Sequence, residues 1–295
     1  MSTTAQPWDR LHIEQELGEI DLASGTEQST DYARVVDPEG RHYGDTNFAP
    51  LFVNTLRPVK ALVDLPDGTV HAREAVQFLS VPQPDRPMNV RLTVADKYIR
   101  RGHRYLVLKY AVNVESEPVM VANKTFVWPG KSTNPDTAPQ GDTEWGLFPV
   151  PSTPAVRNFV PRVTTAPQHL LNDFGRVGGG DGPIHTDPDF AEPLFGGTIV
   201  QGMFPYELVT QAMIGLSDTK TWCTGGVMAG RFIGNIRADE EFTLAGIVHD
   251  VREDDDGARI ATCSFSAARS DGTPVLVASA VGPWTNDDDL IEVSA

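Results

Sequence analysis

The spacing of hydrophobic residues along the chain changes from helical to alternating twice, once in each half of the sequence. Apolar positions recur at helical spacing in "LFVNTLRPVKALVD" (51–64) and in "TIVQGMFPYELVTQAMIGL" (198–216). Strand-like runs follow each of these stretches, and the alternation is clearest in "LTVADKYI" (92–99) and "YLVLKYAVNV" (105–114). The pattern predicts an α+β layout in each half, with one helix followed by an antiparallel meander that wraps around it. The expected strand runs are 70–81, 88–100, 104–116 and 118–128, then 225–236, 240–253, 258–270 and 274–284.

Two segments of the sequence resemble each other and indicate an internal duplication. They are "DYARVVDPEGRHYGDTNFAPLF" (31–52) and "DFGRVGGGDGPIHTDPDFAEPLF" (173–195). Both begin with Asp-aromatic-x-Arg-Val, both carry an aspartate further on (Asp45 and Asp187), and both end in Pro-Leu-Phe. We expect Asp187 to cap the segment that follows it, because its counterpart Asp45 lies in a half with different chemistry.

The duplication predicts a division of the chain into two units. The first unit is expected at 1–130, a linker rich in Pro, Thr and Gly at 131–156, and the second unit at 157–295. A single all-β sandwich is the alternative, but the long helical pattern at 198–216 counts against it.

Composition and charge exclude several kinds of partner. The 295 residues carry a formal net charge of −16, whereas nucleic acids and anionic membranes are bound by basic surfaces. No apolar run approaches the roughly eighteen residues needed to span a bilayer, and "MSTTAQPWDR" has no signal-peptide pattern, so we expect a cytoplasmic protein. Cys223 and Cys263 form neither a disulfide framework nor a metal-ligand pattern, and we expect both to be buried. No metal and no redox cofactor are predicted.

The stretch "GGGDGPIHTDPDF" (178–190) holds the candidate chemistry. Asp181 and His185 form a close pair of proton-transfer groups, on glycines that let a backbone approach a ligand closely. The first copy carries Tyr43 in place of His185, so only the second copy has a group that titrates near neutral pH at this position. A simple polar turn is the alternative interpretation. Further on, the Gly202 amide would begin a helix and could stabilise an oxyanion.

These residues resemble the MaoC-like, R-specific enoyl-CoA hydratase family. The resemblance is carried by Phe174, Gly179, Pro183, Ile184 and His185, by "DPDFA", and by "GGTIVQGM" before the helix. It implies a double hot-dog fold, two tandem units in each of which an antiparallel sheet wraps a long helix, with an N-terminal unit that usually lacks the catalytic pair. It also implies that His185 is the catalytic histidine, that the Gly202 amide holds the thioester oxygen, and that Thr210 lies near the site.

The register of the resemblance differs at one place. The family's aspartate aligns with Gly180 and its asparagine with Gly182, which leaves Asp181 one residue late, and Gln201 replaces a histidine. We expect the glycines to re-aim Asp181 into the site; the alternative is that the carboxylate role is lost or supplied elsewhere.

Four residues are expected to bind substrate. They are Gly180, Gly182 and Thr210 near the motif, and Arg231, which could reach a coenzyme A phosphate or instead pair with the acidic surface. His71, His103 and His249 lie in or beside strand-like runs and are expected to be structural. His169 lies closer to the motif in the sequence and is a weaker candidate for a role in the site than His185.

The leading hypothesis is a lyase of fatty acid metabolism, a hydratase that adds water to a 2-enoyl-CoA or a dehydratase that works in reverse. Asp181 and His185 would be the acid/base pair and Gly202 the oxyanion donor, with coenzyme A present only as part of the substrate. An acyl-CoA thioesterase on the same fold and a non-catalytic acyl-binding subunit are the alternatives. Whether two chains pair into a homodimer is left open.

Overall fold

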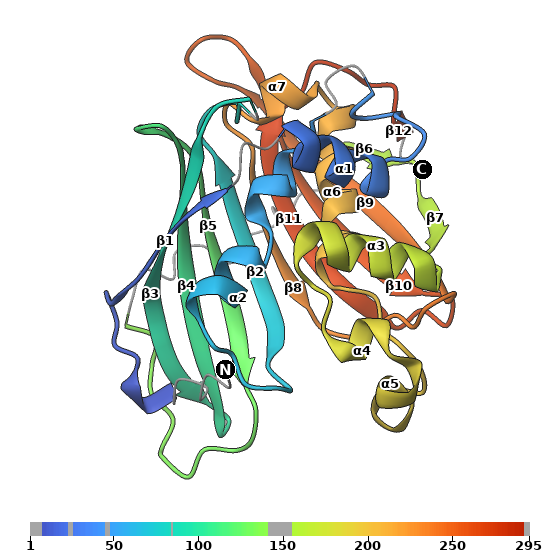
Figure 1. Cartoon of the computed structure of the whole chain (residues 1–295). Helices are drawn as coiled ribbons and strands as arrows, with labels where there is room; N and C mark the ends of the chain where they lie inside the picture. Colours follow the sequence, from blue (N-terminus) through green and yellow to red (C-terminus); the bar gives the residue numbers. More distant parts are fainter. Residues whose placement is uncertain (1–7, 23–25, 45–47, 84, 141–154, 292–295) are drawn as a thin grey trace.

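Strands from both halves of the chain join in one antiparallel sheet (Figure 1). The computed structural model describes residues 8–22, 26–44, 48–83, 85–140 and 155–291. Within them the strand order is β1-β3-β4-β5-β2-β8-β11-β10-β9-β6-β12, and β7 pairs with β9. The order β3-β4-β5-β2 in the first half is mirrored by β9-β10-β11-β8 in the second, as a duplication predicts.

The first half contains five strands and, before and between them, short helical segments. They are a 3-10 helix Trp8–Arg10, β1 (Glu16–Leu22), α1 (Thr26–Val36), a 3-10 helix Pro50–Asn54, α2 (Arg57–Leu62), β2 (Val70–Phe78), β3 (Met88–Arg100), β4 (His103–Val114) and β5 (Glu117–Trp128) among the described residues.

In the second half a long helix precedes four long strands. Its elements are β6 (Arg157–Phe159), β7 (Arg162–Thr165), α3 (Gln168–Gly178), α4 (Pro183–Thr186), α5 (Pro188–Phe195), α6 (Met203–Gly215), α7 (Thr219–Trp222), β8 (Val227–Phe232), β9 (Glu241–Glu253), β10 (Arg259–Arg269), β11 (Pro274–Pro283) and β12 (Leu290–Ile291). All eight strand runs expected from the alternation are present.

The predicted helix at 198–216 is confirmed as α6, which begins at Met203 and is buried along almost its whole length against β9 and β11. The helix expected at 51–64 is wrong: that stretch forms the 3-10 helix Pro50–Asn54 and the short α2. Thr55 between them is extended, and Pro58, which lacks an amide hydrogen, stands in the first turn of α2. The Leu56 amide at this break donates to Gly178 O at 2.9 Å, so the interruption is where the glycine stretch docks.

The two copies of the repeated segment pack against each other through α1 and α3. The equivalent rings of Tyr32 and Phe174 lie 5.9 Å apart, and Arg176 pairs with Asp31 at 3.8 Å. Asp187 caps α5 as predicted, because its side chain accepts from two amides in the first turn of that helix. Its counterpart Asp45 lies outside the described residues.

The strands of the two halves meet at one seam. β2 pairs with β8 from Arg73↔Arg231 to Gln77↔Val227, and small residues face each other there, as in Ala75↔Ala229. In the expected linker, residues 131–140 form neither helix nor strand, and residues 141–154 lie outside the described part. Cys223 and Cys263 are both buried, as expected. None of the helices in the described ranges has the length and apolar character to cross a bilayer.

Candidate active site

A small pocket lies where the first half contacts the motif of the second. It has a volume of about 70 Å³, enough for a few water molecules. Residues from the break before α2, from β2, from the loop after α3 and from the start of α6 line it together. Those that matter for its chemistry are Tyr32, Asn54, His71, Gly180, His185, Gln201 and Gly202.

His185 stands in α4 and faces this pocket with a defined tautomer. Its Nδ1 lies 2.7 Å from the carbonyl oxygen of Ile199. Because a carbonyl can only accept, Nδ1 carries the hydrogen and Nε2 keeps a lone pair. Burial lowers the pKa of His185, and the nearby charge of Lys60 lowers it further, against the opposing effect of the Ile199 bond. The ring is therefore a neutral base near pH 7.

α4 is held in place by bonds to its neighbours. The His185 carbonyl accepts a bond of 2.9 Å from the side chain of Gln168, and the Ile199 amide donates to Ile184 O at 3.0 Å. These bonds fix the segment before α6 against the segment that carries the histidine.

Gly202 immediately precedes α6 and lines the pocket. Its backbone amide donates to no acceptor in the described part of the chain, as expected for the first amides of a helix. A Cβ on Gly202 would lie 2.9 Å from Cδ1 of Phe232, so only glycine allows this approach to β8. The helix dipole adds positive potential at the same point.

The Asp181 carboxylate is not among the groups that line the pocket. It forms an ion pair with Lys60 of α2, and its side chain is 56% exposed. Gly179 adopts the left-handed conformation that ends α3, with a φ of 76°, and a Cβ there would lie 2.9 Å from Arg57 N. The glycines thus allow α3 to end where it contacts the start of α2. Gly180, and not Asp181, forms part of the pocket wall.

Of the four residues expected to bind substrate, Gly180 lines the pocket and the other three do not. Gly182 lies one step away as the N-terminal cap of α4. Thr210 is fully buried and contacts Met228 Sδ at 3.8 Å, outside the lining. Arg231 is exposed on β8, in register with Arg73 across the seam.

Three polar side chains of the pocket were missed by sequence reasoning. Buried Asn54 Oδ1 and Gln201 Oε1 have no hydrogen-bond partner within the described residues, and His71 Nε2 lies 2.9 Å from Glu74 Oε2. Unpaired buried polar atoms are rare, and two on one small pocket indicate a site built for a polar ligand. Asn54 and His71 could not be found from sequence, because the fold brings them to the motif from more than a hundred residues away. Gln201 does carry a signal, its place before the helix glycine.

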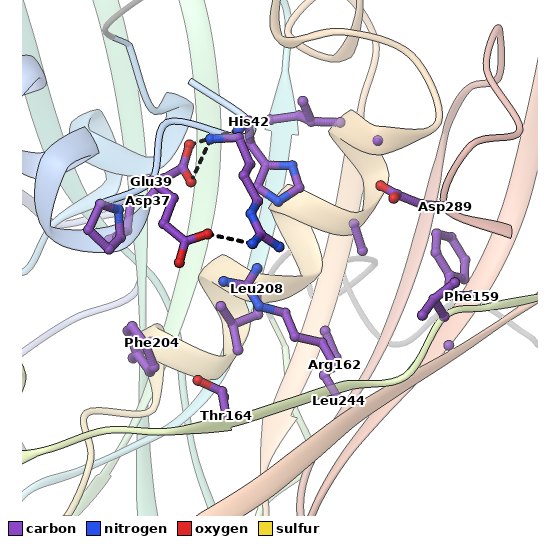
Figure 2. Close-up of a pocket in the computed structure, with 18 of the residues that line it drawn as sticks. Asp37, Glu39, His42, Phe159, Arg162, Thr164, Phe204, Leu208, Leu244 and Asp289 are labelled. Carbon is purple, nitrogen blue, oxygen red and sulfur yellow. Dashed lines mark hydrogen bonds and ion pairs between the residues drawn. The ribbon is translucent and has the colours of Figure 1, made fainter. Parts of the chain in front are cut away.

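A larger cavity of about 1170 Å³ lies elsewhere, between residues 34–42 of the first half and segments of the second half (Figure 2). Figure 2 shows that charged groups of this cavity pair with residues close to them in the sequence. Glu39 pairs with Arg41 at 2.6 Å, and the Asp37 carboxylate accepts from the amide of His42 at 2.7 Å. His169 also lines this cavity and not the small pocket. No group of three or more metal-binding side chains occurs in the described ranges.

Comparison with known proteins shows the fold class of the chain. No family profile and no curated protein matches the sequence. A MaoC-like dehydratase from Phytophthora capsici aligns with a TM-score of 0.68 and 13% identity, over 96% of this chain and 99% of that one. HtdX from Mycobacterium tuberculosis aligns with a TM-score of 0.61 and 20% identity, over 90% and 99%.

A conserved hypothetical protein from Mycobacterium tuberculosis, described as a double hot-dog fold, aligns over 95% of this chain and 99% of its own. Its TM-score is 0.62 and its identity 11%. The chain therefore has a double hot-dog fold. The resemblance seen in the sequence is confirmed at this level, since MaoC-like dehydratases are among its structural neighbours.

Proposed function

We propose that this chain is a hydro-lyase that adds water to a 2-enoyl thioester or removes it from the 3-hydroxyacyl thioester. One observation carries the proposal: His185, with a fixed tautomer, lines the same small pocket as Gly202, whose amide donates to no acceptor among the described residues. Hydration needs both a proton-transfer group and a donor for a developing oxyanion. The fold shared with MaoC-like dehydratases supports the same reaction class.

In the hydration direction, the thioester oxygen accepts a hydrogen bond from the Gly202 amide. His185 Nε2 takes a proton from water as the water oxygen bonds to the β carbon, and charge gathers on the oxygen held by Gly202. The imidazolium then returns this proton to the α carbon, so that one water is added and the enzyme is unchanged. Coenzyme A is the proposed thiol part of the substrate.

A direct assay tests the proposal. Loss of the enoyl-thioester absorbance is followed with crotonyl-CoA and longer 2-enoyl-CoA substrates, and the product is identified as the 3-hydroxyacyl-CoA. His185→Asn should lower kcat by about 10²-fold or more. Release of free thiol without hydroxyacyl product would instead assign a thioesterase. Tight binding without turnover at any chain length would assign an acyl-binding subunit.

A further inference from the structure

A second histidine, His71 of β2, lines the same pocket as His185. Its ring stacks on Phe126 with 5.0 Å between centroids and lies 4.9 Å from the ring of Phe232, which packs against Gly202. The His71 side chain keeps 13% of its area exposed although its Nε2 is buried.

Behind His71 lies a buried network of charged groups. Glu74 Oε2 is 2.9 Å from His71 Nε2 and accepts a bond of 2.9 Å from Lys124 Nζ, and Glu74 Oε1 accepts one of 2.8 Å from Asn54. Neither Glu74 nor Lys124 has any exposed side-chain area. Burial acts to raise the pKa of Glu74, but Lys124, His71 and Asn54 together outweigh it and hold that pKa below its usual value. Glu74 is therefore an anion.

An ionised Glu74 determines which nitrogen of His71 carries the hydrogen. A carboxylate only accepts, so Nε2, which faces it, is protonated and Nδ1 keeps a lone pair. Burial and the charge of Lys124 lower the pKa of His71, against the opposing effects of Glu74 and of a backbone bond to Arg73, so the ring is neutral near pH 7. The charged groups acting on His71 are Glu74 and Lys124, and Lys60 acts on His185.

No carboxylate is among the residues that line the pocket in the described part of the chain. Its titratable members are His71, His185 and Tyr32, and the Tyr32 hydroxyl donates to Glu207 at 3.1 Å. The two imidazoles thus border about 70 Å³ of space, which is room for a few water molecules.

We propose that His71 is a second catalytic residue, whose Nδ1 accepts one hydrogen of the attacking water while His185 Nε2 accepts the other. This inference rests on the proposed hydro-lyase function. The bond between water oxygen and the β carbon forms as the O–H bond to His185 breaks. The C=C electron pair moves toward the thioester, and His185 returns the proton to the α carbon. His71 keeps its own hydrogen on Nε2, and Glu74 is the residue that positions it.

The kinetic test compares His71→Asn with the wild type and with His103→Asn, a control on β4 whose histidine contacts Lys131 outside the pocket. His71→Asn should keep its thermal transition and lower kcat with 2-enoyl-CoA by about 10²-fold. Below neutral pH, log kcat/KM should rise with a limiting slope of about two in the wild type and about one in His71→Asn, since two neutral imidazoles are required in the former. A folded His71→Asn with kcat within about threefold of wild type and the same slope overturns the proposal.

A second measurement does not depend on turnover. In protein labelled with ¹⁵N-histidine, His71 should show the Nε2–H tautomer near pH 7, assigned by its loss in His71→Asn. Saturating 3-hydroxybutyryl-CoA should shift the Nδ1 resonance. An Nδ1–H tautomer, or an Nδ1 resonance that the ligand leaves unmoved, overturns the role of His71 even in an active enzyme. A shifted Nδ1 in a protein without turnover supports the contact with His71 and overturns the hydro-lyase assignment alone.

Discussion

Asp181 and His185 are four residues apart in the sequence, yet their side chains have different surroundings. His185 is held by Ile199 at the pocket, whereas Asp181 pairs with Lys60 and does not line the pocket. We therefore expect Asp181→Asn to change kcat by less than about threefold, while His185→Asn lowers it by about 10²-fold or more. Steady-state kinetics with one enoyl thioester measure both, and Lys60→Met is the matched control for loss of the ion pair. Equal losses of kcat in Asp181→Asn and His185→Asn would mean that Asp181 takes part in catalysis.

Gly180 occupies the position at which the resemblance expects an aspartate. Its backbone has no positive φ, and a Cβ there would lie 3.3 Å from Gln201 Cγ and 3.9 Å from Leu56 Cδ1, both in the pocket wall. Gly180→Asp should supply a carboxylate to the pocket and raise the kcat of His71→Asn about tenfold. Gly182→Asp is the control, because a Cβ there meets nothing within 4 Å. Rescue by both substitutions, or by neither, would contradict a specific carboxylate position at 180.

At the scale of elements, the sequence was informative where periodicity decides the structure. The strands and α6 follow from apolar spacing, because each buries one face or, for α6, nearly all of its surface. The first-half helix failed because the docking of Leu56 on Gly178 breaks it, a contact between distant segments that no local pattern shows. His71 was interpreted as structural for the same reason, since its place in a strand says nothing of the second half packed against it.

The junction of α6 with β8 depends on the absence of a side chain at Gly202. A Cβ there would lie 2.9 Å from the Phe232 ring, so Gly202→Ala should displace the helix start. We expect a loss of about 1–3 kcal/mol in the free energy of unfolding and a fall in kcat of about tenfold or more. Urea unfolding and enoyl-thioester kinetics measure the two effects. Gly225→Ala, where a Cβ meets nothing within 4 Å, should change neither, and an unaltered kcat in Gly202→Ala would remove its amide from the mechanism.

At the scale of the whole molecule, the two halves are joined by a buried carboxyl as well as by the β2–β8 seam. Glu207 of α6 accepts hydrogen bonds from Tyr32 and Tyr43 of the first half, and it is fully buried. Tyr43 is the counterpart of His185 in the repeat, so the first copy uses this position to bind the other half. Burial raises the pKa of Glu207 to about 7, although the tyrosine bonds act in the opposite direction.

This raised pKa makes the joint between the halves sensitive to pH. The native state keeps the Glu207 proton up to about pH 7, whereas an unfolded glutamate loses it near its ordinary pKa of 4.5. The native state binds more protons in that window, so this carboxyl's contribution is fully present below about pH 4.5 and is lost as pH rises through 7, a fall of about 3 kcal/mol. Urea unfolding at several pH values should show this decline in the wild type and not in Glu207→Gln, while exposed Glu253→Gln should behave as the wild type. Parallel pH profiles for wild type and Glu207→Gln would mean that Glu207 is already ionised in the folded protein.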